Sequence, residues 1–494
     1  MDIEYNCIPL ILKQYSFNSK MSMCQLNSRK IMKYTYIDIL QDRGKTIAFP
    51  WELEIFAMFS IMEYEYNNNN FEGKRKNVFN QIITAIRNYT HPKLKDIPPG
   101  TRFIEMFILA TGLIQFKPQE DMRYRLFRFN YIFNYKNNKI DMPKVFKEKF
   151  DLTFDDFLFC FNLFYLLSGN ISVEAYDYIV NTNIKAIQLL KLKRSEFIQK
   201  QQGKLPDGID SAYYALKYLN PYPFIDYNSY IYLPLPHLLI DSITDSLLNR
   251  LTDNDDTLRS NLGKEVLESY LFLILKESNA YDEIIREFQY KIEKNEYSTP
   301  DVMVRTSDKC ILFDSKSSVP SVNLRCFNDI TIKKQTDKCA GYISQLFKRI
   351  KEFGINYYPF ETKMEFKKEN IFGVVVLLEE NYIFKNNIYN QAAELLNINK
   401  NSLDYSYMLS NIKIIGLRDI EEASFISKSY VDGLLEQRDD PNKWYDLTLN
   451  YFNINKKDNI IRINELNKFI NKLSKNLELT LIELYKKGFL KKDI

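Results

Sequence analysis

The feature that most constrains this chain is the stretch STPDVMVRTSDKCILFDSKSS, which covers residues 298–318. It holds two strand-like runs, at 300–304 and 310–318, on either side of TSDK, whose residues favour a tight turn. We therefore predict an antiparallel β-hairpin, and its pairing brings Asp301 near Asp314. The simplest alternative is a solvated surface hairpin that happens to carry charges.

Alternation along the second run determines which of its side chains lie together. Successive residues of a strand point to opposite faces of the sheet. One face carries Cys310, Leu312, Asp314 and Lys316, and the other carries Ile311, Phe313 and Ser315. Asp314 and Lys316 are therefore expected to point the same way. Upstream, Glu265 and Glu268 are three residues apart on an expected helix, so either side chain can reach the same point.

Several carboxylates around one point suit a hard divalent cation. Mg²⁺ takes oxygen ligands and keeps several waters, which leaves room for a phosphate. A lysine beside the metal can orient or help deprotonate a water, and it offsets the charge that builds up on the phosphorane. Phosphodiester hydrolysis is the reaction that uses all of these groups. In the alternative, Lys316 merely forms an ion pair with Asp314.

The hairpin resembles the PD-(D/E)xK nuclease superfamily, whose members share the restriction-endonuclease-like fold. Pro300 and Asp301 match its PD element, and Asp314, Ser315 and Lys316 match its D-x-K element. The resemblance implies that Asp301 and Asp314 bind the metal, with the carbonyl of Ser315 as a further ligand. It also implies that Lys316 is the water-positioning base. The implied cofactor is Mg²⁺, for which Mn²⁺ is a possible substitute.

The resemblance extends to the helices on both sides of the hairpin. The family often carries an acid on the helix before the first strand, and GKEVLESY places Glu268 there, or failing it Glu265. The family often carries a polar residue on the following helix, for which Gln345 is the candidate. The same helix is rich in Lys and Arg, so Lys333 and Lys334 are candidate contacts to nucleic-acid phosphates. A solvated helix face explains these charges equally well.

Pattern changes along the chain predict a multidomain α+β protein. Residues 1–245 are dominated by helical patterns and lie outside the resemblance, and we expect them to form a recognition or regulatory region. Residues 250–420 are expected to form an α/β nuclease-like domain, because a helix, three strands, a second helix and further strands follow one another. The expected strands are 286–292, 300–304, 310–318, 371–380 and 411–417. Residues 421–494 return to helix.

Composition excludes several classes of protein. A formal net charge of +4 does not mark the whole chain as a nucleic-acid binder, so any such surface must be local. The first residues lack the basic start and the small-residue cleavage site of a secretory signal, so export is not expected, and the most hydrophobic stretch is too short to cross a bilayer. The six cysteines include no Cys-x-x-Cys pair, which favours reduced thiols in a cytoplasmic protein without membrane attachment.

Absent motifs narrow the chemistry further. His91 and His237 are the only histidines, which nearly excludes zinc hydrolases and nucleases that use several histidines. No phosphate-binding G-x-x-x-x-G-K-[ST] loop occurs, so any ATPase would be a separate partner protein. The residues from Arg87 to His91 resemble the Arg-Asn…His motif of HEPN ribonucleases, but they are one residue short of its spacing.

These patterns together predict a cytoplasmic, Mg²⁺-dependent endonuclease that cuts DNA, with RNA not excluded. The resemblance to bacterial defence-type nucleases favours a role against phage. Two alternatives stay open: a catalytically silent scaffold that binds nucleic acid or protein, and a ribonuclease that acts through the helical region. A partner protein that senses a trigger, and a homo-oligomer, are open as well.

Overall fold

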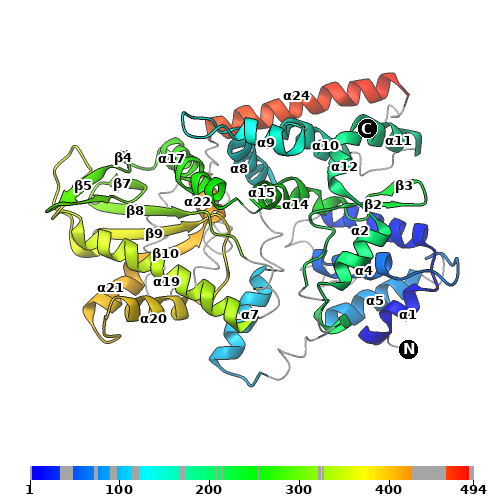
Figure 1. Ribbon diagram of the computed structural model, residues 1–494, viewed down its shortest axis with the longest axis horizontal. Coiled ribbons are helices and arrows are strands. Elements are labelled where there is room, and N and C mark those ends of the chain that lie inside the picture. Colours follow the sequence, from blue (N-terminus) through cyan, green and yellow to red (C-terminus); the bar gives the residue numbers. More distant parts are fainter. Residues whose placement is uncertain are drawn as a thin grey trace.

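The computed structural model describes most of the chain and shows a mixed α+β protein (Figure 1). The described residues are 3–33, 48–71, 76–89, 97–113, 122–166, 173–205, 208–212, 215–253, 255–320, 324, 328–425 and 463–488. The largest sheet has five strands and lies toward one end of the long axis. Within the described residues, no helix is both long and apolar enough to cross a membrane.

The N-terminal half is mostly helical, as predicted, but it also contains a short sheet. Its helices are α1 (Ile8–Leu12), α2 (Phe17–Lys33), α4 (Pro50–Met62), α5 (Lys76–Asn88), α7 (Thr101–Thr111), α8 (Met122–Asn134), α9 (Met142–Phe150), α10 (Phe154–Leu166), α11 (Val173–Thr182), α12 (Ile184–Leu190) and α13 (Arg194–Gln202). The sheet joins β1 (Lys191–Lys193), β2 (Phe224–Tyr227) and β3 (Tyr230–Tyr232). These strands have three or four residues each, too few to show a period in the sequence.

Helix α4 shows how one buried acid joins two N-terminal helices. Pro50 occupies the first helical position, where its missing N–H costs nothing, and the buried carboxylate of Glu52 accepts the N–H of Phe49 at 2.8 Å. The same carboxylate binds Arg87 of α5, with Nε 2.6 Å from Oε1. Arg87 of the HEPN-like motif thus has a structural partner. His91 of that motif lies outside the described residues.

The main sheet has the strand order β10-β9-β8-β7-β4. Its strands are β4 (Glu283–Arg286), β7 (Val302–Thr306), β8 (Lys309–Lys316), β9 (Ile371–Leu377) and β10 (Ile412–Gly416). The pairs β4/β7 and β7/β8 are antiparallel, whereas β8, β9 and β10 run parallel. Thr306 pairs directly with Lys309, so two residues connect β7 to β8. This register confirms the predicted hairpin and its tight turn.

The predicted strand at 286–292 is wrong in its extent. Strand β4 ends at Arg286, and a separate strand, β5 (Gln289–Ile292), pairs with β6 (Asn295–Ser298) in a two-stranded sheet. The chain breaks there because the N–H of Glu287 donates to the carbonyl of Asp301 at 2.9 Å, just before β7 begins. The residues from 287 to 292 alternate between polar and apolar side chains across the break, so the sequence reads as one continuous strand. The break brings the backbone of Glu287 beside Asp301.

Helices cover both faces of the main sheet (Figure 1). One face carries α17 (Glu268–Glu277) and α22 (Leu417–Phe425), and the other carries α19 (Asp329–Glu352), α20 (Lys385–Leu395) and α21 (Leu403–Asn411). Ile311 and Phe313 belong to the core on the α17 side, and Cys310 and Leu312 belong to the core on the α19 side. The predicted alternation along β8 is therefore confirmed.

A single hydrophobic core extends across the boundary predicted near residues 245–250. It joins one face of the main sheet to α8–α12, α14 (Leu239–Ile243), α15 (Asp245–Leu251), α16 (Asp256–Asn261), α17, α22 and α24 (Asn464–Lys486). Inside this core Arg128 of α8 forms an ion pair with Glu421 of α22, and the hydroxyl of Tyr270 donates to Glu421 at 2.6 Å. The helices and the sheet are thus connected by buried polar contacts as well as apolar ones.

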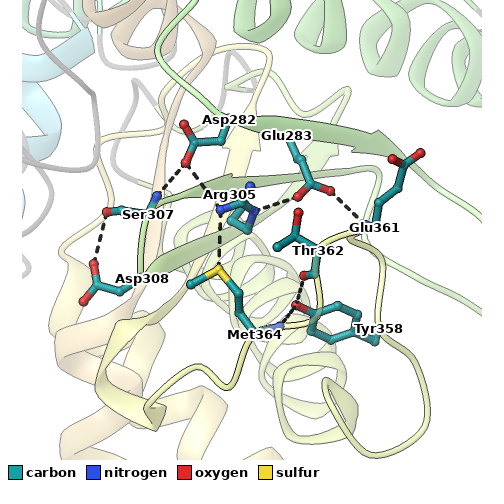
Figure 2. A network of polar contacts seen from close by, with 9 residues as sticks. All are labelled: Asp282, Glu283, Arg305, Ser307, Asp308, Tyr358, Glu361, Thr362 and Met364. Carbon is teal, nitrogen blue, oxygen red and sulfur yellow. Dashed lines mark hydrogen bonds and ion pairs between the residues drawn. The ribbon is translucent and has the colours of Figure 1, made fainter.

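A polar network holds the turn end of the hairpin (Figure 2). The guanidinium of Arg305 has its Nε 2.8 Å from Glu283 Oε1 and its Nη1 3.4 Å from Asp282 Oδ2 and 3.5 Å from Met364 Sδ. The N–H of Ser307, in the turn, donates to the same Asp282 oxygen at 2.7 Å. The network ties β4 and the turn to β7, and the acids of interest lie at the opposite end of the hairpin.

Candidate active site

Asp301 and Asp314 face each other at the open end of the hairpin. Val302 pairs with Phe313, so the next residues outward, Asp301 and Asp314, are opposite each other. Both side chains are buried, with 9% and 1% of their surfaces exposed. Asp301 Oδ2 accepts two hydrogen bonds from Ser315, from the N–H at 2.6 Å and from the hydroxyl at 2.8 Å. The predicted proximity of the two acids is therefore present, and Ser315 restrains one of them.

Glu268 approaches the same end of the sheet from the first residue of α17. The preceding turn, Leu262–Leu267, is a π-helix, a rare form that is frequent at functional sites. It packs closely on the end of β8, because a Cβ at Gly263 would lie 3.1 Å from the hydroxyl of Ser317. The charges of Asp301, Glu287 and Asp314 all act on Glu268. The π-helical segment thus leads directly into Glu268 near the aspartates, and no periodic pattern in the sequence indicates a π-helix there.

Glu265 is held by a loop of the helical region. The side chain of Asn137 donates to Glu265 Oε2 at 2.9 Å, and Lys139 Nζ lies 2.8 Å from Glu265 Oε1. The loop is itself rigidified, because Asn137 Oδ1 accepts the N–H groups of Lys139 and Ile140. Of the two glutamates that the sequence left open, Glu268 is the one that interacts with the aspartates.

The acids at this site have strongly perturbed pKa values. Burial, and then the charge of Asp314, raise the pKa of Asp301 to about 7, against a smaller lowering by Lys316. Burial, and then the charges of Asp301 and Glu287, raise the pKa of Glu268 to about 9. Buried carboxyl groups that repel one another destabilise a fold, so they are typical of sites where the charge is needed.

We expect Glu268→Gln and Glu265→Gln to change stability in opposite directions. The folded-state pKa of Glu268 lies above the ordinary 4.5, so its ionisation opposes folding increasingly from about pH 4.5 to about pH 9. Glu268→Gln removes this penalty and should raise the free energy of unfolding at pH 9 by more than about 1 kcal/mol, with little change at pH 4. Burial works against ionisation of Glu265, but the hydrogen bonds from Lys139 and Asn137 hold its pKa below the ordinary value.

The stabilising charge of Glu265 is present above pH 4.5 and is lost as the pH falls through its lowered pKa. Glu265→Gln should therefore lower the free energy of unfolding at pH 7 and pH 9, by less than about 1 kcal/mol because the partner lysine is exposed. Urea denaturation at pH 4, 7 and 9 measures both effects. If both variants change the free energy of unfolding in the same direction at pH 9, the two glutamates do not have these different environments.

Two cations enclose Asp314. Lys316 Nζ lies 2.8 Å from its Oδ2, and Arg349 Nη1 of α19 lies 3.2 Å from its Oδ1. Lys316 also lies over the ring of Tyr342, with Nζ 5.4 Å from the ring centroid. Burial, together with nearby negative charge that includes Asp314, raises the pKa of Tyr342 to about 12. Helix α19 therefore forms one wall of the site and supplies one of its two cations.

The predicted nucleic-acid contacts all lie on the exposed surface of α19. Gln345 is one turn from Arg349, close to the acids along the helix. Lys333 precedes Arg349 by 16 residues (349 − 333), about 24 Å along a helix axis. Lys333 lines a groove with Arg102 of α7 and Glu394 of α20. The two lysines, Lys333 and Lys334, thus lie at the end of α19 distant from Arg349.

The residues at this site suit a divalent cation in kind. Carboxylate oxygens and a backbone carbonyl are ligands that Mg²⁺ prefers, and a cation would relieve the repulsion that raises the pKa values of Asp301 and Glu268. The acidic side chains are not arranged as a complete set of metal ligands. In the part of the chain that the structure describes, no group of three or more His, Cys, Asp and Glu side chains is arranged to hold a metal ion. Lys316 and Arg349 face the two oxygens of Asp314.

Two residues beside the acids carry no distinguishing signal in the sequence. Glu287 lies within a run that reads as one continuous strand, and only the break after β4 turns it toward Asp301. Arg349 is one of several basic residues on α19, and it meets Asp314 from 35 positions away in the chain. A pattern that spans a few residues cannot separate either of them from its neighbours.

Comparison with known proteins leaves the site to be interpreted from its own geometry. No protein-family model, no curated protein and no solved structure matches this chain.

Proposed function

We propose that this protein is a divalent-metal-dependent nuclease that hydrolyses phosphodiester bonds, with DNA as its substrate. The observation that carries the proposal is the meeting of Asp301, Asp314 and Lys316 at one end of the hairpin, beside the helix that begins with Glu268. The raised pKa values of Asp301 and Glu268 support the proposal. Buried carboxyl groups that repel one another lower the stability of a fold, and they are typical of functional sites that use their charge.

Each side chain has a role that its position supports. The metal would be held by Asp301, Asp314, Glu268 and the carbonyl of Ser315, and when bound it polarises a phosphoryl oxygen and acidifies a water. Lys316 is partly exposed, so its ammonium can hold the attacking water and offset negative charge on the phosphoryl oxygens. The two hydrogen bonds from Ser315 keep the Asp301 carboxylate in one orientation.

Lys316→Met should lower the rate of Mg²⁺-dependent DNA cleavage by at least about 10²-fold, because the ammonium supplies both proton handling and charge stabilisation. Methionine keeps the length and the apolar stem of the side chain. The matched control is Lys309→Met, at the turn end of the same strand, which should stay within about twofold of wild type. The rate is measured as loss of supercoiled plasmid with Mg²⁺, with Mn²⁺ and with EDTA.

Several outcomes would count against the whole proposal or a part of it. Cleavage that persists in EDTA would exclude a metal-dependent reaction, and a wild-type rate in Lys316→Met would exclude a catalytic role for Lys316. Wild-type protein that binds DNA but cuts neither DNA nor RNA with either metal would favour the silent scaffold. Cleavage of RNA but not of DNA would change the proposed substrate and leave the proposed site unchanged.

The proposal extends to a cytoplasmic location and to defence against foreign DNA. The described cysteines Cys7, Cys24, Cys160, Cys310 and Cys339 are free thiols, which supports a reducing compartment. The defence role rests on the resemblance of the hairpin alone, as does a partner that senses a trigger. Phage plating on cells that express wild type or Lys316→Met would test the defence role.

A further inference from the structure

Asp314 is in contact with two positively charged side chains. Its side chain is almost fully buried, yet each carboxylate oxygen faces a cation, Lys316 at Oδ2 and Arg349 at Oδ1. The two side chains together carry two positive charges, the same charge that a divalent ion would bring. A metal ion on Asp314 would therefore have to share one carboxylate with two cations, and Coulomb repulsion opposes that arrangement.

Arg349 is the cation that can leave. Arg349 reaches Asp314 from a separate helix, 35 positions along the chain, and donates a hydrogen bond to Oδ1 at 3.2 Å, whereas Lys316 lies two residues from Asp314 on the same strand. The two side chains are similarly exposed, 26% for Arg349 and 22% for Lys316. Lys316 is further restrained by the ring of Tyr342 beneath its ammonium. The backbone of Arg349 is held in place, because its carbonyl accepts the hydroxyl of Tyr357 at 2.9 Å and the N–H of Phe353 at 3.1 Å. An exchange of partners would therefore involve the side chain of Arg349 and not its backbone.

We propose that Arg349 exchanges partners during function: it neutralises Asp314 in the metal-free protein, and metal binding releases its guanidinium to bind a phosphate of the substrate. This inference rests on the proposed nuclease function and names a further residue for it. The planar fork of an arginine suits a phosphate group, which accepts two parallel hydrogen bonds. One short movement of one side chain thus couples occupancy of the metal site to substrate binding.

The proposed exchange predicts that removal of Arg349 changes the affinity for metal and the affinity for DNA in opposite directions. Removing Arg349 removes a competitor for Asp314, so metal binding should strengthen. Removing Arg349 also removes a phosphate contact, so DNA binding in the presence of metal should weaken. A purely structural role would instead weaken both, because a disturbed site binds metal and DNA less well.

The test compares Arg349→Ala with wild type and with Lys348→Ala, an exposed neighbour on the same helix. Mn²⁺ binding to the full chain is titrated by electron paramagnetic resonance without DNA, and DNA binding is measured by fluorescence anisotropy in Ca²⁺. We expect Arg349→Ala to bind Mn²⁺ about 5-fold more tightly, the fold-change set by loss of one partly exposed ion pair. We expect its DNA affinity to fall about 10-fold, as for a charge-assisted contact to phosphate.

Further variants separate this exchange from simpler explanations. Lys348→Ala should leave the Mn²⁺ affinity unchanged. Arg349→Lys should restore the weaker, wild-type Mn²⁺ affinity but not the full DNA affinity, because lysine keeps the charge and loses the fork. Arg349→Gln replaces Arg349→Ala if the alanine variant does not fold. Mn²⁺ binding that is equal to or weaker than wild type in Arg349→Ala overturns the exchange alone, whereas wild type that binds no Mn²⁺ overturns the proposed function as well.

Discussion

Asp314→Asn is expected to abolish metal-dependent cleavage, with a loss of at least about 10³-fold, or about 4 kcal/mol of transition-state stabilisation. The substitution keeps the shape of a side chain that is only 1% exposed, so the strand and its hairpin should be undisturbed. It removes the negative charge that faces Lys316 and Arg349, and with it the central ligand of the proposed metal site. Single-turnover cleavage of a plasmid measures the effect.

The matched control for this variant is Asp308→Asn, in the turn of the same hairpin. Asp308 accepts hydrogen bonds from Ser307 at 3.3 Å and from Asn370 at 2.9 Å, and it lies at the end of the hairpin opposite the acids. We expect its activity to stay within about twofold of wild type, as for most surface substitutions. If both variants lose activity equally, the effect comes from the hairpin fold; if neither does, Asp314 has no catalytic part.

Arg128→Met is expected to lower the free energy of unfolding by about 3 to 5 kcal/mol, the usual cost of removing one partner from a buried ion pair. Arg128 and Glu421 are 2% and 0% exposed, and Arg128 Nε lies 2.8 Å from Glu421 Oε1. Tyr270 also donates to that oxygen, so the pair joins α8, α17 and α22. The loss is measured by urea denaturation at pH 7.

An exposed ion pair provides the control for this prediction. Arg102 of α7 contacts Asp329 at the start of α19, but 48% and 79% of these side chains are exposed. Arg102→Met should therefore cost less than about 1 kcal/mol. The double variant Arg128→Met, Glu421→Leu should recover most of the stability, since it leaves no unpaired buried charge. A loss below about 1 kcal/mol in Arg128→Met would show that the pair does not hold these helices together.

Much of the sheet region follows from local patterns in the sequence. The turn residues between Thr306 and Lys309, the alternation along β8 and the apolar runs of β9 and β10 each predict the element that is found. The extent of β4 was harder to predict, because the alternation of polar and apolar residues continues past the bend at Glu287. That bend depends on a backbone hydrogen bond to Asp301, 14 residues later (301 − 287), and not on any residue preference at the bend itself.

The sequence alone determined that Asp301, Asp314 and Lys316 would lie together, because strand pairing and alternation act over a few residues. Only the tertiary structure decided between Glu265 and Glu268. The deciding contact is the ion pair between Lys139 and Glu265, which are 126 positions apart in the chain. Glu265 is occupied by this contact, whereas Glu268 follows the π-helical segment and lies near the aspartates. Arg349 was likewise selected from a basic helix by packing of α19 on the sheet, because a charge acquires a role only when folding places its partner within reach.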